Sequence, residues 1–393
     1  MRNAAGAASA RPRVAVVGAG VIGLSIGWRL AAAGCETHLF ERDQPGRSAS
    51  WAAGGMLMAG VEIEPGEEWL WPLTRRSQEL WPGFVQELEA AAGQPVGYRG
   101  EGTLVTALGR DDVEALRFHH DLQTRVGARL HWLSGAEVRE REPFLAAGTV
   151  AGVFSPDDHQ VDNRWLVEAL ITAFRRAGGH LHSQSPVTEI RIEGGPASGR
   201  ARGVVAQDRF QPADMVVVAA GAWSRDLPGL PAAVRPPVRP IRGQLLYLEM
   251  PADAPLLQHV VWPPRAYLIP RQDGRLLVGA TSEERGFTAA MTAGGVYSLL
   301  DGAWRGLPGI EELTLRELVV GFRPGSRDDA PILGPTSVDG LVMATGHHRN
   351  GILLTPVTAE IISRFILTGN CDPVAQPFTL ARFARPPVAG TTP

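Results

Sequence analysis

Glycine residues gather at two distant places in this chain, and at both places their spacing suits nucleotide binding. The first set, Gly18, Gly20 and Gly23, precedes an acidic residue, Glu41, by about 20 positions. Such glycines let backbone amides approach a pyrophosphate, and a carboxylate at that sequence spacing accepts hydrogen bonds from both ribose hydroxyls. The second set lies in the stretch 344–356, Ala-Thr-Gly-His-His-Arg-Asn-Gly-Ile-Leu-Leu-Thr-Pro. Together they predict a dinucleotide that one helix holds at its pyrophosphate and another at its redox ring.

The residues around the first glycines predict the elements that position them. Val14 to Val17 is a short apolar run typical of a buried strand, and Glu36 to Phe40 is a second strand. Between them, Val21 to Ala33 has a helical pattern that ends at Gly34. Met215 to Ala219 is another buried strand, which we expect to return to the same sheet. The nucleotide-binding module is therefore expected to be interrupted by other segments.

A run of small and hydroxyl residues from Arg47 to Met56 favours FAD over NAD. Backbone with few side chains can approach a planar ring closely. A loop of small residues under a helix would have the same composition. Its position shortly after Glu41 favours a role in cofactor binding.

Further elements are predicted along the rest of the chain. Helical patterns cover Arg75 to about Gly93 with a break at Pro82, Asp111 to Gly127, and Asn163 to Ala177, and Ser134 to Glu137 forms a capping box. Strands are expected at Val187 to Ile192, Ala201 to Ala206, Arg265 to Pro270 and Arg275 to Ala280, the last two joined by the turn 272–274. We expect the antiparallel region 247–280 to roof the substrate site.

Composition excludes several classes of protein. The 393 residues carry a net charge of −3, and no apolar stretch has the length of a membrane span, so neither nucleic acid nor membrane is an expected partner. Met1 to Pro12 lacks the apolar run of a secretory signal, and the two cysteines, Cys35 and Cys371, stand far apart, so we expect a cytoplasmic enzyme. All 38 basic residues are arginine, which excludes catalysis through lysine. The ten histidines show no metal spacing, so no metal is expected.

An arginine, Arg323, stands in the turn-rich stretch from Gly321 to Gly334, ahead of a strand at Leu341 to Ala344. From sequence alone, a surface ion pair with Asp328 or Asp329 is the commonest outcome for such a residue. Because the chain has no lysine, any anion in its active site must be met by arginine, backbone amides or hydroxyls.

These motifs together resemble those of the D-amino-acid oxidase superfamily of FAD-dependent amine oxidoreductases, and within it the glycine oxidases of thiamine biosynthesis. The resemblance covers nearly the whole chain. It depends on the fingerprint from Gly18 to Glu41, on Ser48 to Met56, on Val218-Ala-Ala-Gly-Ala-Trp223 and on Gly321-Phe-Arg-Pro. The string from Gly346 to Pro356 is the most specific of them.

The resemblance implies roles for individual residues. Arg323 is expected to hold the substrate carboxylate as a bidentate partner, Arg349 to contact the same carboxylate, and Tyr267 to orient the substrate through its hydroxyl. No side chain is required as an acid or base. The residues expected to contact FAD are Gly18, Ala19, Gly20, Val21, Ile22, Gly23, Glu41, Arg42, Ser48, Ala49, Ser50, Gly54, Gly55, Met56, Val187, Ala220, Gly221, Trp223, His347, His348, Arg349, Asn350, Gly351, Ile352 and Leu353.

The implied reaction is oxidative deamination of a small amine such as glycine, sarcosine or a small D-amino acid. Hydride passes from Cα to flavin N5, dioxygen becomes hydrogen peroxide, and the imine hydrolyses. We expect the negative charge that develops on the flavin to be met by a helix that begins near Gly351. Monomeric sarcosine oxidases use a cysteine to attach flavin and a lysine near the ring. Neither has a counterpart here, so FAD is expected to be non-covalent.

The implied fold is α/β, with a Rossmann-like FAD-binding domain on a parallel sheet and a substrate domain (α+β) on a mixed or antiparallel sheet. We expect the FAD-binding domain to comprise residues 11–75, 145–225 and 321–371, and the substrate-binding domain to comprise 76–144 and 226–320. Residues 372–393 are expected to form a tail. A homo-oligomer, a tetramer in glycine oxidases, is implied by the resemblance alone.

Other functions stay open at this stage. One is a dehydrogenase of the same fold that passes electrons to a quinone or a protein carrier. Another is an oxidase for a larger primary or secondary amine. A flavin-binding subunit without catalysis would not need Arg323, Tyr267 and Arg349, and an NAD dehydrogenase would not need the string from Gly346 to Pro356.

Overall fold

The computed structural model describes residues 11–195 and 199–384 and contains the parallel nucleotide-binding sheet that the sequence predicts. This six-stranded sheet comprises β1 (Val14–Val17), β2 (Thr37–Phe40), β8 (His180–His182), β12 (Met215–Val218), β18 (Ile332–Pro335) and β19 (Leu341–Thr345). The strand order is β18-β19-β12-β1-β2-β8, and every neighbouring pair is parallel except β18 with β19. Strand β12 pairs directly with β1, which confirms that the chain returns to the first sheet after a long excursion.

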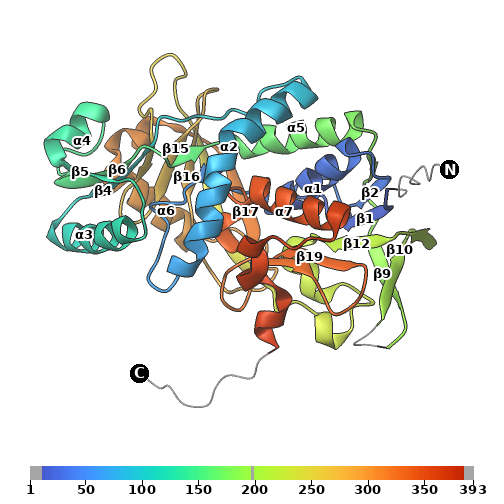
Figure 1. The fold of residues 1–393 in the computed structure, drawn as a ribbon. Coiled ribbons are helices and arrows are strands. Elements are labelled where there is room, and N and C mark those ends of the chain that lie inside the picture. Colours follow the sequence, from blue (N-terminus) through green and yellow to red (C-terminus); the bar gives the residue numbers. More distant parts are fainter. Residues whose placement is uncertain (1–10, 196–198, 385–393) are drawn as a thin grey trace, which may run out of the picture.

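The two faces of this sheet are covered by different layers. Val14 and Val16 of β1 pack into a core with the helices, whereas Ala15 and Val17 face a small antiparallel sheet, as the alternation of side chains along a strand requires. The helices are α1 (Val21–Ala32), α2 (Trp71–Ala92), α5 (Asn163–Arg176) and α7 (Thr355–Thr368), and the small sheet comprises β9 (Val187–Glu193), β10 (Arg200–Ala206) and β11 (Arg209–Pro212). Figure 1 shows α1, α5 and α7 beside β1, β2 and β12.

A second, eight-stranded sheet forms the other half of the molecule. Its strands are β4 (Thr103–Ala107), β5 (His131–Ser134), β6 (Ala151–Ser155), β13 (Arg239–Glu249), β14 (Val260–Trp262), β15 (Tyr267–Pro270), β16 (Arg275–Gly279) and β17 (Thr314–Gly325). Their order is β17-β13-β16-β15-β14-β4-β6-β5, and only the β14–β4 pair is parallel. This confirms the mixed sheet that was expected, including the hairpin of β15 and β16. Two short strands, β3 (Met56–Leu57) and β7 (His159–Gln160), pair beside it.

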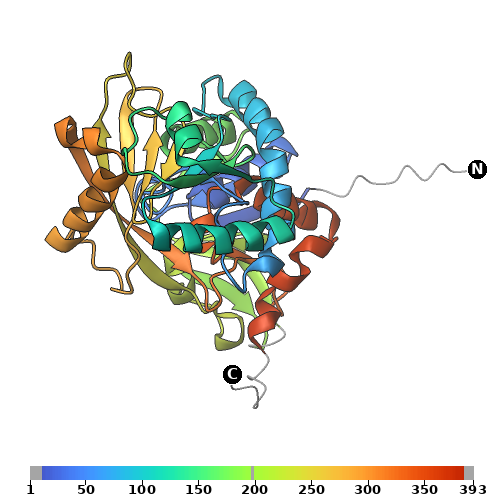
Figure 2. The ribbon, with the colours of Figure 1, turned by 90° about the vertical axis from the view of Figure 1, so that its left-hand side faces the viewer.

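The eight-stranded sheet has an outer face that packs on a helix and an inner face that looks towards the first sheet. Leu268 belongs to the outer core, which includes Leu299 of α6 (Ala293–Gly306), whereas the neighbouring Tyr267 belongs to the inner one. Figure 2 shows α6 (orange) on the outside of the sheet. Helices α3 (Arg110–Arg125) and α4 (Gly135–Arg141) complete this half, and α4 begins with the predicted capping box between Ser134 and Glu137. The inner face is therefore the one available to a site between the sheets.

Helix α2 corrects one expectation, because it runs through Pro82 without a break. Proline in a helix interior removes a hydrogen bond and costs about 3 kcal/mol. The buried face of α2, which includes Trp81, Phe84 and Leu88, packs in the same core as α1, α5 and α7. We attribute the continuity of the helix to this packing, which offsets the cost of the proline.

The C-terminal segment up to residue 384 packs against the body, although a tail was expected from residue 372. It forms two short 3-10 turns, η6 (Pro373–Phe378) and η7 (Leu380–Phe383). Phe378 is buried and stacks on Trp69, and Arg382 pairs with Asp328. The remainder of the expected tail, 385–393, lies outside the described residues.

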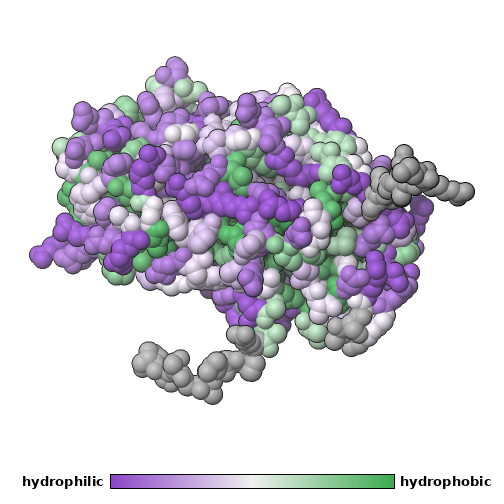
Figure 3. Space-filling model, in the orientation of Figure 1, coloured by the Kyte–Doolittle hydropathy of each residue, from purple (hydrophilic) through white to green (hydrophobic). Residues whose placement is uncertain are grey.

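One face of the molecule is mixed in polarity (Figure 3), and the described helices lack the features of a membrane span. Figure 3 shows hydrophilic and hydrophobic residues interspersed over one face of the molecule. Within the described residues, no helix combines the length and the apolar character needed to cross a membrane, and no group of three or more histidine, cysteine or carboxylate side chains is arranged to hold a metal ion.

Replacing Trp81 by alanine is expected to lower the free energy of unfolding by about 3–5 kcal/mol. Its ring is 1% exposed, and its Nε1 donates to the Leu353 carbonyl at 2.8 Å, so the change leaves a cavity and removes one buried hydrogen bond. Urea unfolding of the FAD-loaded protein measures this. The control Trp304→Ala removes a tryptophan that is 47% exposed and should cost less than about 1 kcal/mol. Equal losses would contradict the assignment of α2 to the core.

Candidate active site

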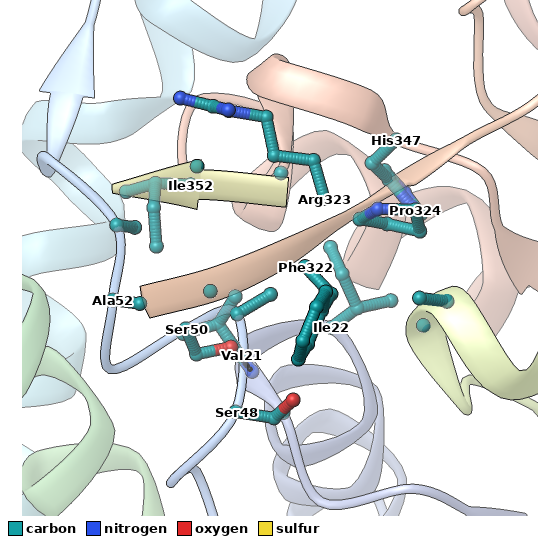
Figure 4. A pocket seen from close by; sticks show the side chains of 18 of the residues that line it. Val21, Ile22, Ser48, Ser50, Ala52, Phe322, Arg323, Pro324, His347 and Ile352 are labelled. Atoms are coloured by element: carbon teal, nitrogen blue, oxygen red, sulfur yellow. Dashed lines mark hydrogen bonds between the residues drawn. The ribbon is translucent and has the colours of Figure 1, made fainter. Parts of the chain in front are cut away.

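A cavity of about 830 Å³ lies between the two sheets and is lined by residues from both. A volume of this size is typical of a site for a cofactor or a drug-sized ligand. In Figure 4, Val21 and Ile22 from the start of α1 and Ser48 and Ser50 from the loop after β2 lie on one side of strand β17. Arg323 of that strand points to the opposite side.

The turn between β1 and α1 is built without room for side chains. Gly18 has a φ of +107°, and a Cβ there would lie 2.4 Å from the Ala219 carbonyl oxygen. A Cβ at Gly23 would lie 1.9 Å from the Gly18 carbonyl oxygen. Within the described residues, the amides of Gly20 and Ile22 donate no hydrogen bond, and both residues line the cavity. Free amides at a helix N-terminus that face a cavity suit a pyrophosphate.

Side chains of Glu41 and Ser50 fix this turn. The Glu41 carboxylate accepts hydrogen bonds from the amides of Ala19, at 2.9 Å, and Asp43, at 3.1 Å. The Ser50 hydroxyl accepts from the Val21 amide at 3.0 Å. The carboxylate oxygens have further lone pairs, and Glu41 lines the edge of the cavity. It can therefore still accept hydrogen bonds from the hydroxyl groups of a ribose.

The second glycine-rich stretch forms the opposite wall. Gly346 has a φ of +74°, and the 3-10 turn η5 (His348–Asn350) follows it. Within the described residues, the amides of Gly351 and Ile352 have no hydrogen-bond partner, and both residues line the cavity. The helix that was expected to begin near Gly351 begins at Thr355, four residues later, because residues 351–354 form a turn before α7.

The two histidines of this loop are neutral. Burial lowers the pKa of His347 to about 3, and its Nε2 lies 3.1 Å from the Thr358 hydroxyl. Burial and the neighbouring Arg349 lower the pKa of His348 to about 3 as well. Neither histidine adds positive charge to the cavity at neutral pH.

Arg323 and Tyr267 come together at one end of the cavity. The Tyr267 side chain is buried, and burial raises the pKa of its hydroxyl to about 12, against the opposing effect of Arg323 beside it. Arg323 donates to the Thr281 carbonyl at 3.0 Å, and no carboxylate pairs with it among the described residues. Asp328 pairs with Arg382 and Asp329 with Arg239, so the alternative of a surface ion pair for Arg323 does not apply.

Glycines make room for these two side chains. A Cβ at Gly243 would lie 2.5 Å from Nη1 of Arg323, and a Cβ at Gly279 would lie 2.3 Å from the ring of Tyr267. Both glycines stand on neighbouring strands of the inner sheet face, β13 and β16. The position of the guanidinium is therefore set by backbone rather than by a partner charge.

Arg349 lies in the same cavity but is paired with carboxylates. It forms a short ion pair with Glu67, it donates to the Glu62 carbonyl at 3.1 Å, and its Nε lies 3.8 Å from the Glu62 carboxylate. The two glutamates offset its charge. These contacts use Nη2 and Nε, so its expected contact with a substrate carboxylate would fall to Nη1.

Glu62 is a cavity residue that the sequence motifs did not indicate. It follows the small-residue loop and lines the cavity near Arg323 and Tyr267. Burial raises the pKa of Glu62 to about 7, against the lowering effect of Arg349. No spacing rule pointed to it, because its position depends on the path of the chain after β3.

Most residues expected to contact FAD or substrate line the cavity. Among them, Arg42 stacks on Trp223, with its guanidinium carbon 3.7 Å from the ring centre. Three expected residues do not line the cavity: Ala19, Gly23 and Leu353. Ala19 and Gly23 hold the turn behind it, and the Leu353 carbonyl accepts hydrogen bonds from α2. Neither Cys35 nor Cys371 lines the cavity.

The cavity fits a flavin dinucleotide. Unpaired amides stand at the start of α1 and in the loop before α7, the glycine turn leaves space that a Cβ would fill, and a carboxylate stands at the ribose position. Free amides at a helix N-terminus and a carboxylate at the end of the second strand, beside a parallel sheet, define a dinucleotide-binding protein.

The chain belongs to the family of FAD dependent oxidoreductases, whose model matches residues 13–365. Its sequence is 35% identical to glycine oxidase of Geobacillus kaustophilus over 94% of this chain and 96% of that protein. The crystal structure of that glycine oxidase matches with a TM-score of 0.86, covering 95% of this chain and 99% of the other. FAD is therefore the cofactor.

A longer protein is also similar. The "Bifunctional protein ThiO/ThiG" of Trichormus variabilis is 34% identical over 97% of this chain. The chain spans only 56% of the length of that relative.

Replacing Gly23 by alanine is expected to weaken FAD binding at least tenfold, or about 1.4 kcal/mol. The added Cβ meets the Gly18 carbonyl oxygen and forces α1 away from the turn. Titration of the apoprotein with FAD, followed by flavin fluorescence, measures the affinity. In the control Gly83→Ala, no atom lies within 4 Å of the added Cβ, and the affinity should not change. Equal affinities for both variants would show that the turn does not carry the cofactor.

Proposed function

We propose that this protein oxidises a small amino acid, glycine first, at its Cα–N bond, with FAD as the cofactor and dioxygen as the acceptor. The observation that carries the proposal is Arg323, a cation without a carboxylate partner among the described residues, which lies beside the neutral Tyr267 hydroxyl in the cavity. The similarity to glycine oxidases supports the same substrate class.

Arg323 is suited to a carboxylate ligand. A partly buried guanidinium that lacks a counter-ion gains from a carboxylate, and its planar fork matches the two oxygens. The Tyr267 hydroxyl stays protonated at neutral pH and can donate to the same group. These contacts would hold the substrate by its carboxylate and leave Cα and the amine facing into the cavity.

When bound, FAD would supply the electron acceptor for oxidation at Cα, with dioxygen as the final acceptor and hydrogen peroxide as its product. The chain's own contribution is mainly positioning. The amides of Gly351 and Ile352 would donate to the electron-rich edge of the flavin, where negative charge develops. We propose the cavity-lining residues named above as the cofactor site, and we propose that they hold FAD non-covalently, since the cysteine that attaches flavin in monomeric sarcosine oxidases has no counterpart at this cavity.

We extend the proposal to location, assembly and pathway. A cytoplasmic location is consistent with the two cysteines, which are both free. A homo-oligomer and a role in thiamine biosynthesis depend on the resemblance, and the division into domains at the residues given above is a proposal. A dehydrogenase with another electron acceptor and an oxidase for larger amines are the alternatives.

The proposed function is tested by mixing the protein anaerobically with glycine, sarcosine and D-alanine in turn while the flavin absorbance is recorded. Bleaching by glycine, followed by recovery and hydrogen peroxide when air is admitted, is the expected result. Bleaching with slow recovery in air would identify a dehydrogenase. Bleaching only by larger amines would contradict glycine as the substrate.

Replacing Arg323 by alanine is expected to raise KM for glycine roughly 10- to 100-fold, because a charge-assisted contact contributes about 1.5–3 kcal/mol. Steady-state oxygen consumption at varied glycine measures the change. The control Arg305→Ala removes an exposed arginine of α6 that pairs with Asp301 outside the cavity, and KM should stay unchanged. An Arg323→Ala variant with normal KM would overturn the role of this residue.

A further inference from the structure

Glu62 is a carboxylate in the cavity whose function is not explained by packing. Its side chain is only 10% exposed, and it lines both the main cavity and a small pocket behind it. Within residues 11–195 and 199–384, no hydrogen bond to its carboxylate is found, and the nearest cation atom is Nε of Arg349 at 3.8 Å. A buried carboxylate normally accepts several hydrogen bonds, so this one has free acceptor capacity.

The backbone that carries Glu62 is held firmly. The buried Asp158 carboxylate accepts from the amides of Gly60, at 3.0 Å, and Val61, at 2.9 Å, and Gln78 donates to the same carboxylate. Two hydrogen bonds to this buried side chain fix the segment that precedes Glu62, and the third, from Gln78, ties the carboxylate to α2. The free carboxylate is therefore positioned by the fold.

The charged groups around Glu62 come from several segments. The charged groups are Arg349 from η5, Arg323 from β17, and the carboxylates of Glu67 and Asp158, and the neutral Tyr267 hydroxyl from β15 lies beside them. Glu67 shares Arg349 with Glu62 but lines only the small pocket behind the main cavity. Of the two glutamates on Arg349, only Glu62 can meet a ligand in the main cavity.

We propose that Glu62 accepts the proton that the substrate ammonium must lose before its Cα–H bond is oxidised. The inference depends on the proposed function. One N–H bond of the ammonium breaks and one O–H bond forms on Glu62, which leaves a neutral amine and a neutral carboxyl group. No electrons are transferred in this step, and the proton later leaves to solvent.

The need for such a group follows from the substrate. Alkyl amines have a pKa of about 10, so at pH 7 roughly one molecule in a thousand carries a neutral nitrogen. A carboxylate beside the amine gives the proton a direct route off the bound ammonium when its own pKa is close to the working pH. Burial raises the pKa of Glu62 to about 7, so the group is a carboxylate above that pH and cannot accept a proton below it.

The experiment is anaerobic stopped-flow reduction of the flavin by saturating glycine between about pH 6 and 10. In the native protein, the rate should fall as the pH drops through about 7, where Glu62 becomes protonated. The variant Glu62→Gln should be at least tenfold slower at pH 7, and the deficit should shrink near pH 10, where solution supplies the neutral amine. Glu62→Asp keeps a carboxylate and should retain the acidic limb of the profile.

The matched control is Glu67→Gln, which also removes a carboxylate from Arg349 but not from the main cavity. Whatever its rate, it should keep the native pH dependence.

A Glu62→Gln variant with the native profile, or equal pH-independent losses in Glu62→Gln and Glu67→Gln, would overturn the inference and leave the proposed function intact. If Glu62→Gln fails to bind FAD, loss of the acidic limb in Glu62→Asp overturns it equally. A native protein that no amino acid bleaches would overturn the proposed function and this inference with it.

Discussion

The cavity depends on an arginine, Arg323, that has no carboxylate partner within residues 11–195 and 199–384. Buried cations are normally neutralised, because an unpaired charge in a low-dielectric interior is costly. Arg349 has two glutamates and Arg242 has Glu283, whereas Arg323 has the Thr281 carbonyl and no carboxylate among the described residues. A carboxylate that enters the cavity would supply the missing charge, so the protein is prepared for an anionic ligand at this point.

The rest of the fold keeps that charge in place beside the cofactor. Strand β17 carries Arg323, and its neighbour β13 contributes a glycine whose missing side chain leaves space for the guanidinium. On the other side, the glycine turn before α1 brings backbone amides to the cavity without side chains between them. Two sheets with different strand patterns thus contribute to one site, and neither sheet would hold it alone (Figures 1 and 4).

The sequence predicted the local elements well because their signals are local. The run Val14–Val17, the glycines after it and the helix that follows are fixed by short-range patterns, and the capping box before α4 is likewise encoded in four residues. The return of β12 to β1 was also predicted, but contacts between individual side chains across the chain were not accessible in this way. The partners of Arg349 and the position of Glu62 arise where segments far apart in the chain meet, and the continuity of α2 through Pro82 depends on packing against other helices.

The most direct test of the central claim is a crystal structure of the protein with FAD and acetate, a carboxylate that cannot be oxidised at an amine. The account predicts that both acetate oxygens lie about 2.7–2.9 Å from guanidinium nitrogens of Arg323, with the Tyr267 hydroxyl beside them. Acetate bound to a different arginine, or an Arg323 that still contacts only the Thr281 carbonyl, would contradict it.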